Sequence, residues 1–123
     1  YGPGRERLLA KVGNFQFTEP ENTSWTNRIH SEDCAGVLAQ LLENTDKAMN
    51  GMGLMIATDN EPALNTEVEK WLAGEMKDEY PDFKAEEVFV RGKRCSNRKL
   101  LESGYRFEYP TYREGYRELI GNL

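Results

Sequence analysis

The sequence predicts a small α/β or α+β domain in which short strands alternate with about five helices. Three observations lead to this class. Apolar residues recur at helical spacing in several segments, capping-box patterns precede two of these segments, and only short apolar runs of strand length lie between them. The chain has 123 residues, the usual size of one domain, so we expect residues 1–123 to form a single domain.

The first half of the chain predicts two helices. Leu8, Leu9 and Val12 share one helical face, and Gly13 follows as a C-cap. A second helix begins at Ser31, a residue type that favours the N-cap. Its apolar stripe is predicted to face the core and consists of Cys34, Val37, Leu38, Leu41 and Leu42.

The middle of the chain predicts a third helix and several short strands. A capping box of Thr66 and Glu69 starts the helix, and Pro81 prevents its continuation. Its apolar stripe consists of Val68, Trp71, Leu72 and Met76. The strand candidates are Phe15, Phe17, and residues 25–29, 54–57 and 88–90.

Two further helices are predicted towards the C-terminus. Ser96 caps a short helix that ends at Gly104. A second capping box, Thr111 and Glu114, starts a final helix that extends to about Ile120.

Composition excludes several classes of protein. The formal charge of −5 and the pI near 5.0 give no electrostatic reason to expect a nucleic-acid partner. No apolar run approaches the ~20 residues that a membrane-spanning helix needs. Two cysteines, Cys34 and Cys95, are too few for a disulfide scaffold, so we expect reduced thiols in a cytoplasmic protein. Cys34 is expected to be a small buried hydrophobe rather than a nucleophile.

No motif predicts a bound cofactor or metal. The chain has no G-x-G-x-x-G turn, whose glycines would let the backbone approach a pyrophosphate. The single histidine, His30, cannot form a multi-histidine metal site, and its place before a helix suggests a structural hydrogen bond over a substrate contact.

Two groups of side chains are candidates for ligand binding. The aromatic tail is expected to pack locally or against another domain rather than to stack on a ligand. It consists of Tyr105, Phe107, Tyr109, Tyr112 and Tyr116. The cluster of basic residues has two interpretations: a solvated loop, or an anion site in which arginines and the amides near Ser96 hold a phosphate or carboxylate. Its members are Arg91, Lys93, Arg94, Arg98 and Lys99.

Four segments resemble, in order, the C-terminal part of extended short-chain dehydrogenase/reductase proteins. They read Y-G-P-G at residues 1–4, I-H-S-E-D-C-A at 29–35 and A-T-D-N-E-P at 57–62, and the fourth is the K-R-C-S-N to Y-R-E-G run at 93–115. The group most similar to this chain is the NAD(P)-dependent epimerase/dehydratase or nucleoside-diphosphate-sugar epimerase group. Many of its members carry an arginine four residues before the histidine, where this chain has Thr26 and, two residues later, Arg28.

The resemblance implies a substrate-binding domain separated from its N-terminal Rossmann half. NAD or NADP would then belong to the parent protein, and this chain alone would bind neither. A catalytic Y-x-x-x-K of the family has one match, at Tyr80 to Lys84, which we reject because Pro81 disfavours helix at Tyr80. The candidate substrate-binding residues are Arg91, Arg94 and Arg28, for a small anionic substrate.

Two hypotheses of function remain open. In the first, the chain is the substrate-binding portion of an epimerase, dehydratase or reductase and is inactive alone. In the second, it is an independent small-ligand-binding or protein-interaction module without catalysis. A domain without its Rossmann half would expose an apolar face, with Tyr1, Trp25 and the aromatic tail as candidates, and such a face favours homo-oligomers.

Overall fold

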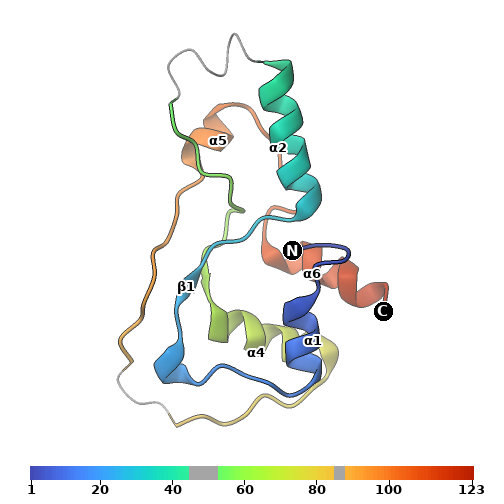
Figure 1. Ribbon diagram of the computed structural model, residues 1–123. Helices are drawn as coiled ribbons and strands as arrows, with labels where there is room; N and C mark the ends of the chain where they lie inside the picture. The colour runs from blue at the N-terminus through green and yellow to red at the C-terminus, as the bar shows by residue number, and fades with distance from the viewer. Residues whose placement is uncertain (45–52, 85–87) are drawn as a thin grey trace.

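The computed structural model of the protein describes residues 1–44, 53–84 and 88–123. These residues contain five α-helices and a two-stranded sheet, which confirms the predicted small α+β class (Figure 1). A short 3₁₀ turn, Pro20–Asn22, precedes the first strand. In chain order the elements are α1 (Arg7–Gly13), β1 (Trp25–Thr26), α2 (Ser31–Glu43), β2 (Ala63–Leu64), α4 (Asn65–Met76), α5 (Arg98–Glu102) and α6 (Tyr112–Gly121).

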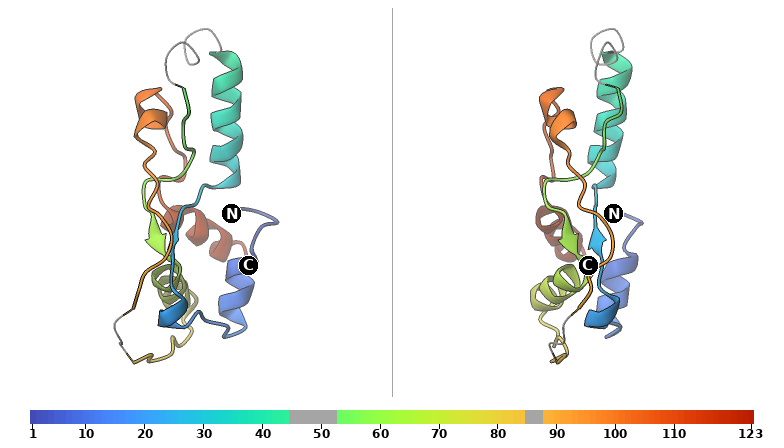
Figure 2. Two further views of the ribbon diagram at one scale, coloured as in Figure 1. Left: turned by 60° about the vertical axis from the view of Figure 1, so that its left-hand side comes forward. Right: turned by 90° about the vertical axis from the view of Figure 1, so that its left-hand side faces the viewer.

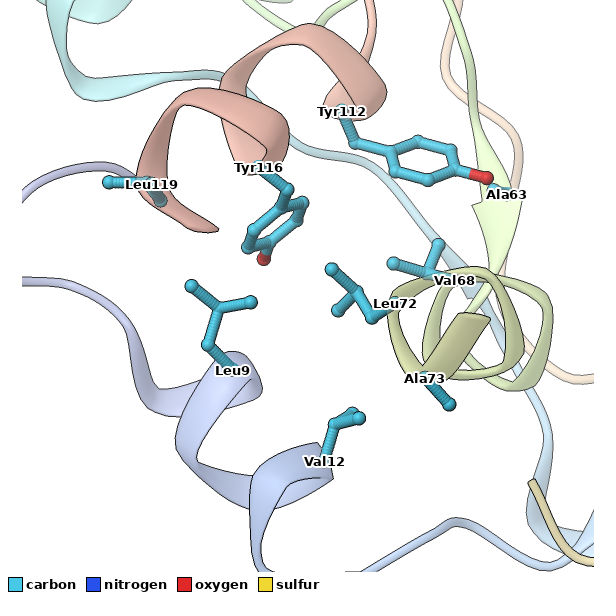
Figure 3. Packing of buried hydrophobic residues seen from close by; sticks show 9 residues of the cluster. All are labelled: Leu9, Val12, Ala63, Val68, Leu72, Ala73, Tyr112, Tyr116 and Leu119. Carbon is cyan, nitrogen blue, oxygen red and sulfur yellow. The ribbon is translucent and has the colours of Figure 1, made fainter. Parts of the chain in front are cut away.

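The hydrophobic core lies where α1, α4 and α6 converge (Figure 3). The predicted stripe of α4 supplies Val68 and Leu72, and neither side chain is accessible to solvent. Helix α6 begins as predicted, because Glu114 accepts a hydrogen bond from the Thr111 amide at 2.9 Å. The buried members of the cluster are Leu9, Val12, Ala63, Val68, Leu72, Ala73, Tyr112, Tyr116 and Leu119.

The sheet is small, and a third segment lies along it. β1 and β2 are antiparallel, with Trp25 opposite Leu64. On the other side of β1, the Trp25 amide donates to the carbonyl of Arg91 at 2.8 Å. Gly92 follows with φ of +85°, and a Cβ at this position would lie 2.9 Å from the Trp25 carbonyl oxygen. Glycine therefore permits the close approach of the basic segment to β1.

Helices α2 and α5 form the other end of the molecule, away from α1 and α4 (Figures 1 and 2). Buried Asp33 in α2 holds the chain that follows α5. Its carboxylate accepts hydrogen bonds from the Tyr105 hydroxyl at 2.8 Å and from the Glu108 and Tyr109 amides, each at 2.9 Å. Three donors satisfy one buried carboxylate, so this contact fixes which side of α2 faces the molecule.

The apolar stripe predicted for α2 is largely wrong. Val37 is buried, but Leu38 is 58% exposed and Leu42 is 77% exposed. Cys34 is also exposed, contrary to the expectation of a buried side chain. The reason is that the hydrogen bonds of Asp33 turn the helix so that most of its apolar residues face outwards.

The start of α4 differs from the predicted capping box. The helix begins at Asn65, and Glu67 accepts a hydrogen bond from the Leu64 amide at 3.1 Å. Glu69 is instead 1% exposed and accepts hydrogen bonds from Lys11 and Thr18. Glu69 is therefore a tertiary contact and does not cap the helix.

Most of the predicted strands are also wrong. Residues 54–57 and 88–90 have no strand structure, and Leu54 is 82% exposed. Phe15 lies in no strand and has φ of +56°. Gly13, the expected C-cap, is the last residue of α1, and Asn14 is the C-cap. Apolar runs of this length form strands only where a neighbouring strand pairs with them. Of the predicted strands within the described residues, only part of residues 25–29 is paired in a sheet. The sequence N-G-M-G at residues 50–53 also favours a turn, and residues 50–52 lie outside the described residues.

Candidate functional site

A surface hollow of about 370 Å³ lies between the segment that follows Thr58 and the segment that precedes α5. Asn97 joins the two walls, because its side-chain amide donates to the Thr58 carbonyl at 3.0 Å and to Asn60 Oδ1 at 2.7 Å. The lining residues are Asp59, Asn60, Pro62, Arg94, Cys95, Ser96 and Asn97. The predicted D-N-E-P and K-R-C-S-N segments therefore meet at one site.

Arg94 is the cationic side chain of this hollow. Its guanidinium lies 4.8 Å from the centre of the Trp25 ring, which positions it through a cation–π contact. Asn27 holds the backbone on either side of Arg94: it donates to the Lys93 carbonyl and accepts from the Cys95 amide, both at 2.8 Å. Within the described residues Arg94 is exposed and forms no ion pair, so its charge is free for an anion.

The other residues of the basic cluster do not line the hollow. The Arg98 amide, one of the helix amides expected to meet an anion, donates to Ser96 Oγ at 3.3 Å. The Arg98 side chain pairs with Glu102 at 3.5 Å, and Lys99 Nζ donates to the Leu54 carbonyl. Arg91 is exposed, and its carbonyl pairs with β1.

Arg28 lies on the other side of β1 from Arg94. Its guanidinium donates to Thr26 Oγ1 at 2.5 Å and lies 5.9 Å from the centre of the Tyr112 ring in α6. Side chains of consecutive strand residues point to opposite faces, so Trp25 with Arg94 and Thr26 with Arg28 are separated by the strand. The structure thus does not gather the three predicted arginines around one ligand.

Asp59 is a member of the hollow that the sequence analysis did not single out, although it begins the D-N-E-P motif. It is 2% exposed, and its Oδ1 accepts from the Glu61 amide at 3.0 Å. Its Oδ2 has no hydrogen-bond partner among the described residues. Burial raises the pKa of Asp59 to about 6, although the amide of Glu61 and the charge of Arg28 both act to lower it.

The aromatic residues near the C-terminus mostly pack locally. Tyr116 stacks on Tyr1 with ring centres 4.4 Å apart, and Tyr109 lies 3.9 Å from the His30 ring. His30 is 2% exposed, and its Nδ1 accepts a hydrogen bond from the Glu32 amide at 3.3 Å. His30 is thus the N-cap of α2 in place of Ser31, in agreement with the expected structural role.

Other functional candidates find little support in the structure. The segment of the rejected Y-x-x-x-K match is not helical, and Tyr80 packs on Phe17 and Phe83. Among the described residues, no group of three or more His, Cys, Asp or Glu side chains is placed to hold a metal ion. No helix in the described part of the chain is long and apolar enough to cross a membrane.

The chain is similar to a solved protein from Methylobacillus flagellatus that is provisionally described as an NAD-dependent epimerase/dehydratase. The two share 36% identity with a TM-score of 0.83. The match covers 99% of this chain but only 44% of the other, so this chain spans less than half the length of that protein. No protein-family model and no curated protein matches the chain.

Proposed function

We propose that residues 1–123 are the substrate-binding portion of a longer NAD(P)-dependent epimerase/dehydratase or reductase, and that they are inactive alone. The similarity over 99% of this chain and 44% of the longer protein carries the proposal. The order of the four sequence segments, from Y-G-P-G to Y-R-E-G, supports it independently. The missing partner is then an N-terminal Rossmann half of the same polypeptide, in the cytoplasm.

The residues of this chain do not fit the dinucleotide. The glycine-rich turn is absent from the sequence, and the strands in the described residues are two residues long. NAD or NADP, when bound by the other half, supplies hydride transfer at a carbinol carbon. The task of this chain is to hold the substrate against that half and to exclude water from the cleft.

The substrate group that best fits the hollow is an anion such as a phosphate or carboxylate. Arg94 offers a planar guanidinium whose donors match either group, and the Trp25 ring holds it in place. Arg91, three residues earlier on the same exposed segment, adds positive charge. Arg28 is the weakest of the three candidates, because Thr26 and Tyr112 already engage it.

Steady-state kinetics of the longer protein test this assignment. A charge-assisted contact contributes about 1.5–3 kcal/mol, so Arg94→Ala should raise KM about tenfold or more. Arg91→Ala should act in the same direction. Both variants should keep the wild-type melting temperature, because exposed charges contribute little to stability.

The controls separate substrate binding from folding. Arg106→Ala removes another exposed arginine, which does not line the hollow, and should leave KM unchanged. His30→Ala should lower the melting temperature clearly and the turnover only slightly, because His30 is buried and caps α2. If the arginine variants melt early and keep KM, the basic segment is structural and the anion assignment is wrong.

The alternative of an independent binding module has its own test. The gene upstream of Tyr1 should encode an in-frame nucleotide-binding half. A start codon close to Tyr1 would instead favour the module without catalysis.

A further inference from the structure

The outward side of α2 is apolar along its whole length. Five exposed residues occupy this side, and no charged residue lies between them. We refer to these residues as the apolar α2 face: Cys34, Ala35, Leu38, Ala39 and Leu42. A single exposed leucine is ordinary, but an uninterrupted apolar stripe on a helix marks a surface that another element covers.

The inward side of α2 is polar and cannot be exchanged for the outward side. Asp33 binds three donors from the chain that follows α5, and Gln40 Nε2 donates to Ser103 Oγ at 3.0 Å. At Gly36, a Cβ would lie only 2.5 Å from the Tyr105 hydroxyl oxygen, so the helix packs closely there. Rotating α2 to bury its leucines would break all these contacts.

Segments near α2 also expose apolar side chains. The segment at 53–57 and helix α5 lie next to α2 in the views of Figures 1 and 2. They expose Leu54 by 82%, Ile56 by 42% and Leu101 by 43%. Five of the eight large hydrophobic residues that are exposed in the described part of the chain thus lie at the α2 end, and the other three are Phe15, Phe89 and Leu123.

The surfaces expected from the sequence are mostly engaged. Tyr1 stacks on Tyr116, and Trp25 lies under the guanidinium of Arg94. Tyr109, Tyr112 and Tyr116 of the aromatic tail are buried within this chain. The expected apolar face is therefore found elsewhere, on α2.

We infer that the apolar α2 face is the docking surface for the part of the polypeptide that precedes Tyr1, an inference that rests on the proposed function. The similar protein is more than twice as long as this chain, so more than a hundred residues lie outside the match. Tyr1 is held at the first turn of α2, because the Ser31 amide donates to the Tyr1 carbonyl at 2.7 Å. A preceding chain emerges beside this face and needs no long linker to cover it.

Cys34 lies in this face, so the rate at which its thiol reacts with a maleimide shows whether the face is covered. The experiment compares the rate of maleimide labelling at Cys34 in residues 1–123 and in the longer protein, both carrying Cys95→Ser. The isolated chain is labelled at low micromolar concentration, because its exposed apolar face favours self-association. We expect labelling to be a hundredfold or more slower in the longer protein.

A control variant shows whether the protection is local. Glu79→Cys is combined with Cys34→Ser and with the same Cys95→Ser. It places a thiol at an exposed position beyond α4, at the other end of the molecule. It should be labelled equally fast in both proteins. Equal labelling of Cys34 in both proteins would overturn the inference, and so would protection that disappears when the longer protein is diluted, since a second copy would then be the cover.

A substitution on the face provides a second readout. Leu38→Asp should lower the melting temperature of the longer protein by several degrees, while residues 1–123 alone should melt as the wild type does. Binding of NADH and of NADPH to the wild-type longer protein, measured by their fluorescence, tests the proposed function separately. Binding of either cofactor with freely labelled Cys34 refutes only the docking surface, and a protected Cys34 with binding of neither cofactor refutes only the proposed function.

Discussion

Asp59 carries a charge that its surroundings disfavour. It is buried at the hollow, and one carboxylate oxygen has no partner among the described residues. Arg28 opposes the effect of burial, while Glu61 and Glu114 add to it. The hollow therefore combines the exposed cation of Arg94 with a carboxyl group whose pKa burial raises to about 6.

Stability should depend on pH through Asp59. Burial raises its pKa from the ordinary 3.8 to about 6, so the folded state binds more protons than the unfolded state between these values. The stabilising contribution of Asp59, which comes from its protonated form, is therefore fully present below pH 3.8 and is lost as the pH rises through 6. Asp59→Asn keeps the acceptor for the Glu61 amide and removes the charge.

Urea unfolding measured at two pH values tests this expectation. At pH 8, Asp59→Asn should be more stable than the wild type by on the order of 1–3 kcal/mol. The gain should shrink or vanish near pH 4. A gain of equal size at both pH values would show that Asp59 does not titrate in this window.

At the scale of elements, Glu69 joins α4 to α1 and to the loop between α1 and β1. Its carboxylate accepts from Lys11 Nζ at 2.6 Å, from the Thr18 amide at 2.7 Å and from Thr18 Oγ1 at 2.7 Å. Glu69 is almost fully buried, whereas Lys11 is about one-third exposed. One carboxylate thus fixes the packing of two helices.

Removing Glu69 should destabilise the fold strongly. Glu69→Ala removes the acceptor of the Thr18 amide and the carboxylate that pairs with the Lys11 ammonium, at a cost of about 2–4 kcal/mol. Chemical denaturation measures this difference. The matched control is Glu75→Ala, a substitution on the same helix as Glu69. It breaks the solvent-exposed ion pair with Arg117 of α6 and should change the free energy of unfolding little. Similar effects of the two substitutions would contradict the role assigned to Glu69.

At the scale of the whole molecule, the core lies at one end, and five of the eight large hydrophobic residues that are exposed in the described part of the chain lie at the other. Figure 3 shows the cluster in which buried side chains of α1, α4 and α6 meet. The α2 end is held by hydrogen bonds of Asp33 and exposes its leucines. This asymmetry is what we expect of one part of a larger protein.

Residues 1–123 should not bind NAD(H) or NADP(H) specifically. The sequence lacks the glycine-rich turn that lets a pyrophosphate approach the backbone. Isothermal titration of the purified chain should show no saturable heat. Stoichiometric binding with a micromolar Kd would place a dinucleotide site among residues that we regard as structural.

Local patterns in the sequence determined the features that depend on neighbours along the chain. The capping box of Thr111 and Glu114, the stripe of Val68 and Leu72, and the turn at Gly104 with φ of +90° all agree with the structure. Their energies come from contacts within a few residues, so residue spacing is sufficient to predict them. The meeting of the D-N-E-P and K-R-C-S-N segments at the hollow was not predicted, because the two segments lie far apart in the chain.

Only the tertiary structure decided which side of each element faces the molecule. The apolar spacing of α2 correctly predicted a helix, but the three donors to Asp33 turned its leucines outwards. The pairing of β1 with Arg91 placed Arg94 and Arg28 on different sides of a strand, and the burial of Asp59 raised its pKa. These outcomes depend on hydrogen bonds and desolvation between residues far apart in the chain, which spacing within one segment does not encode.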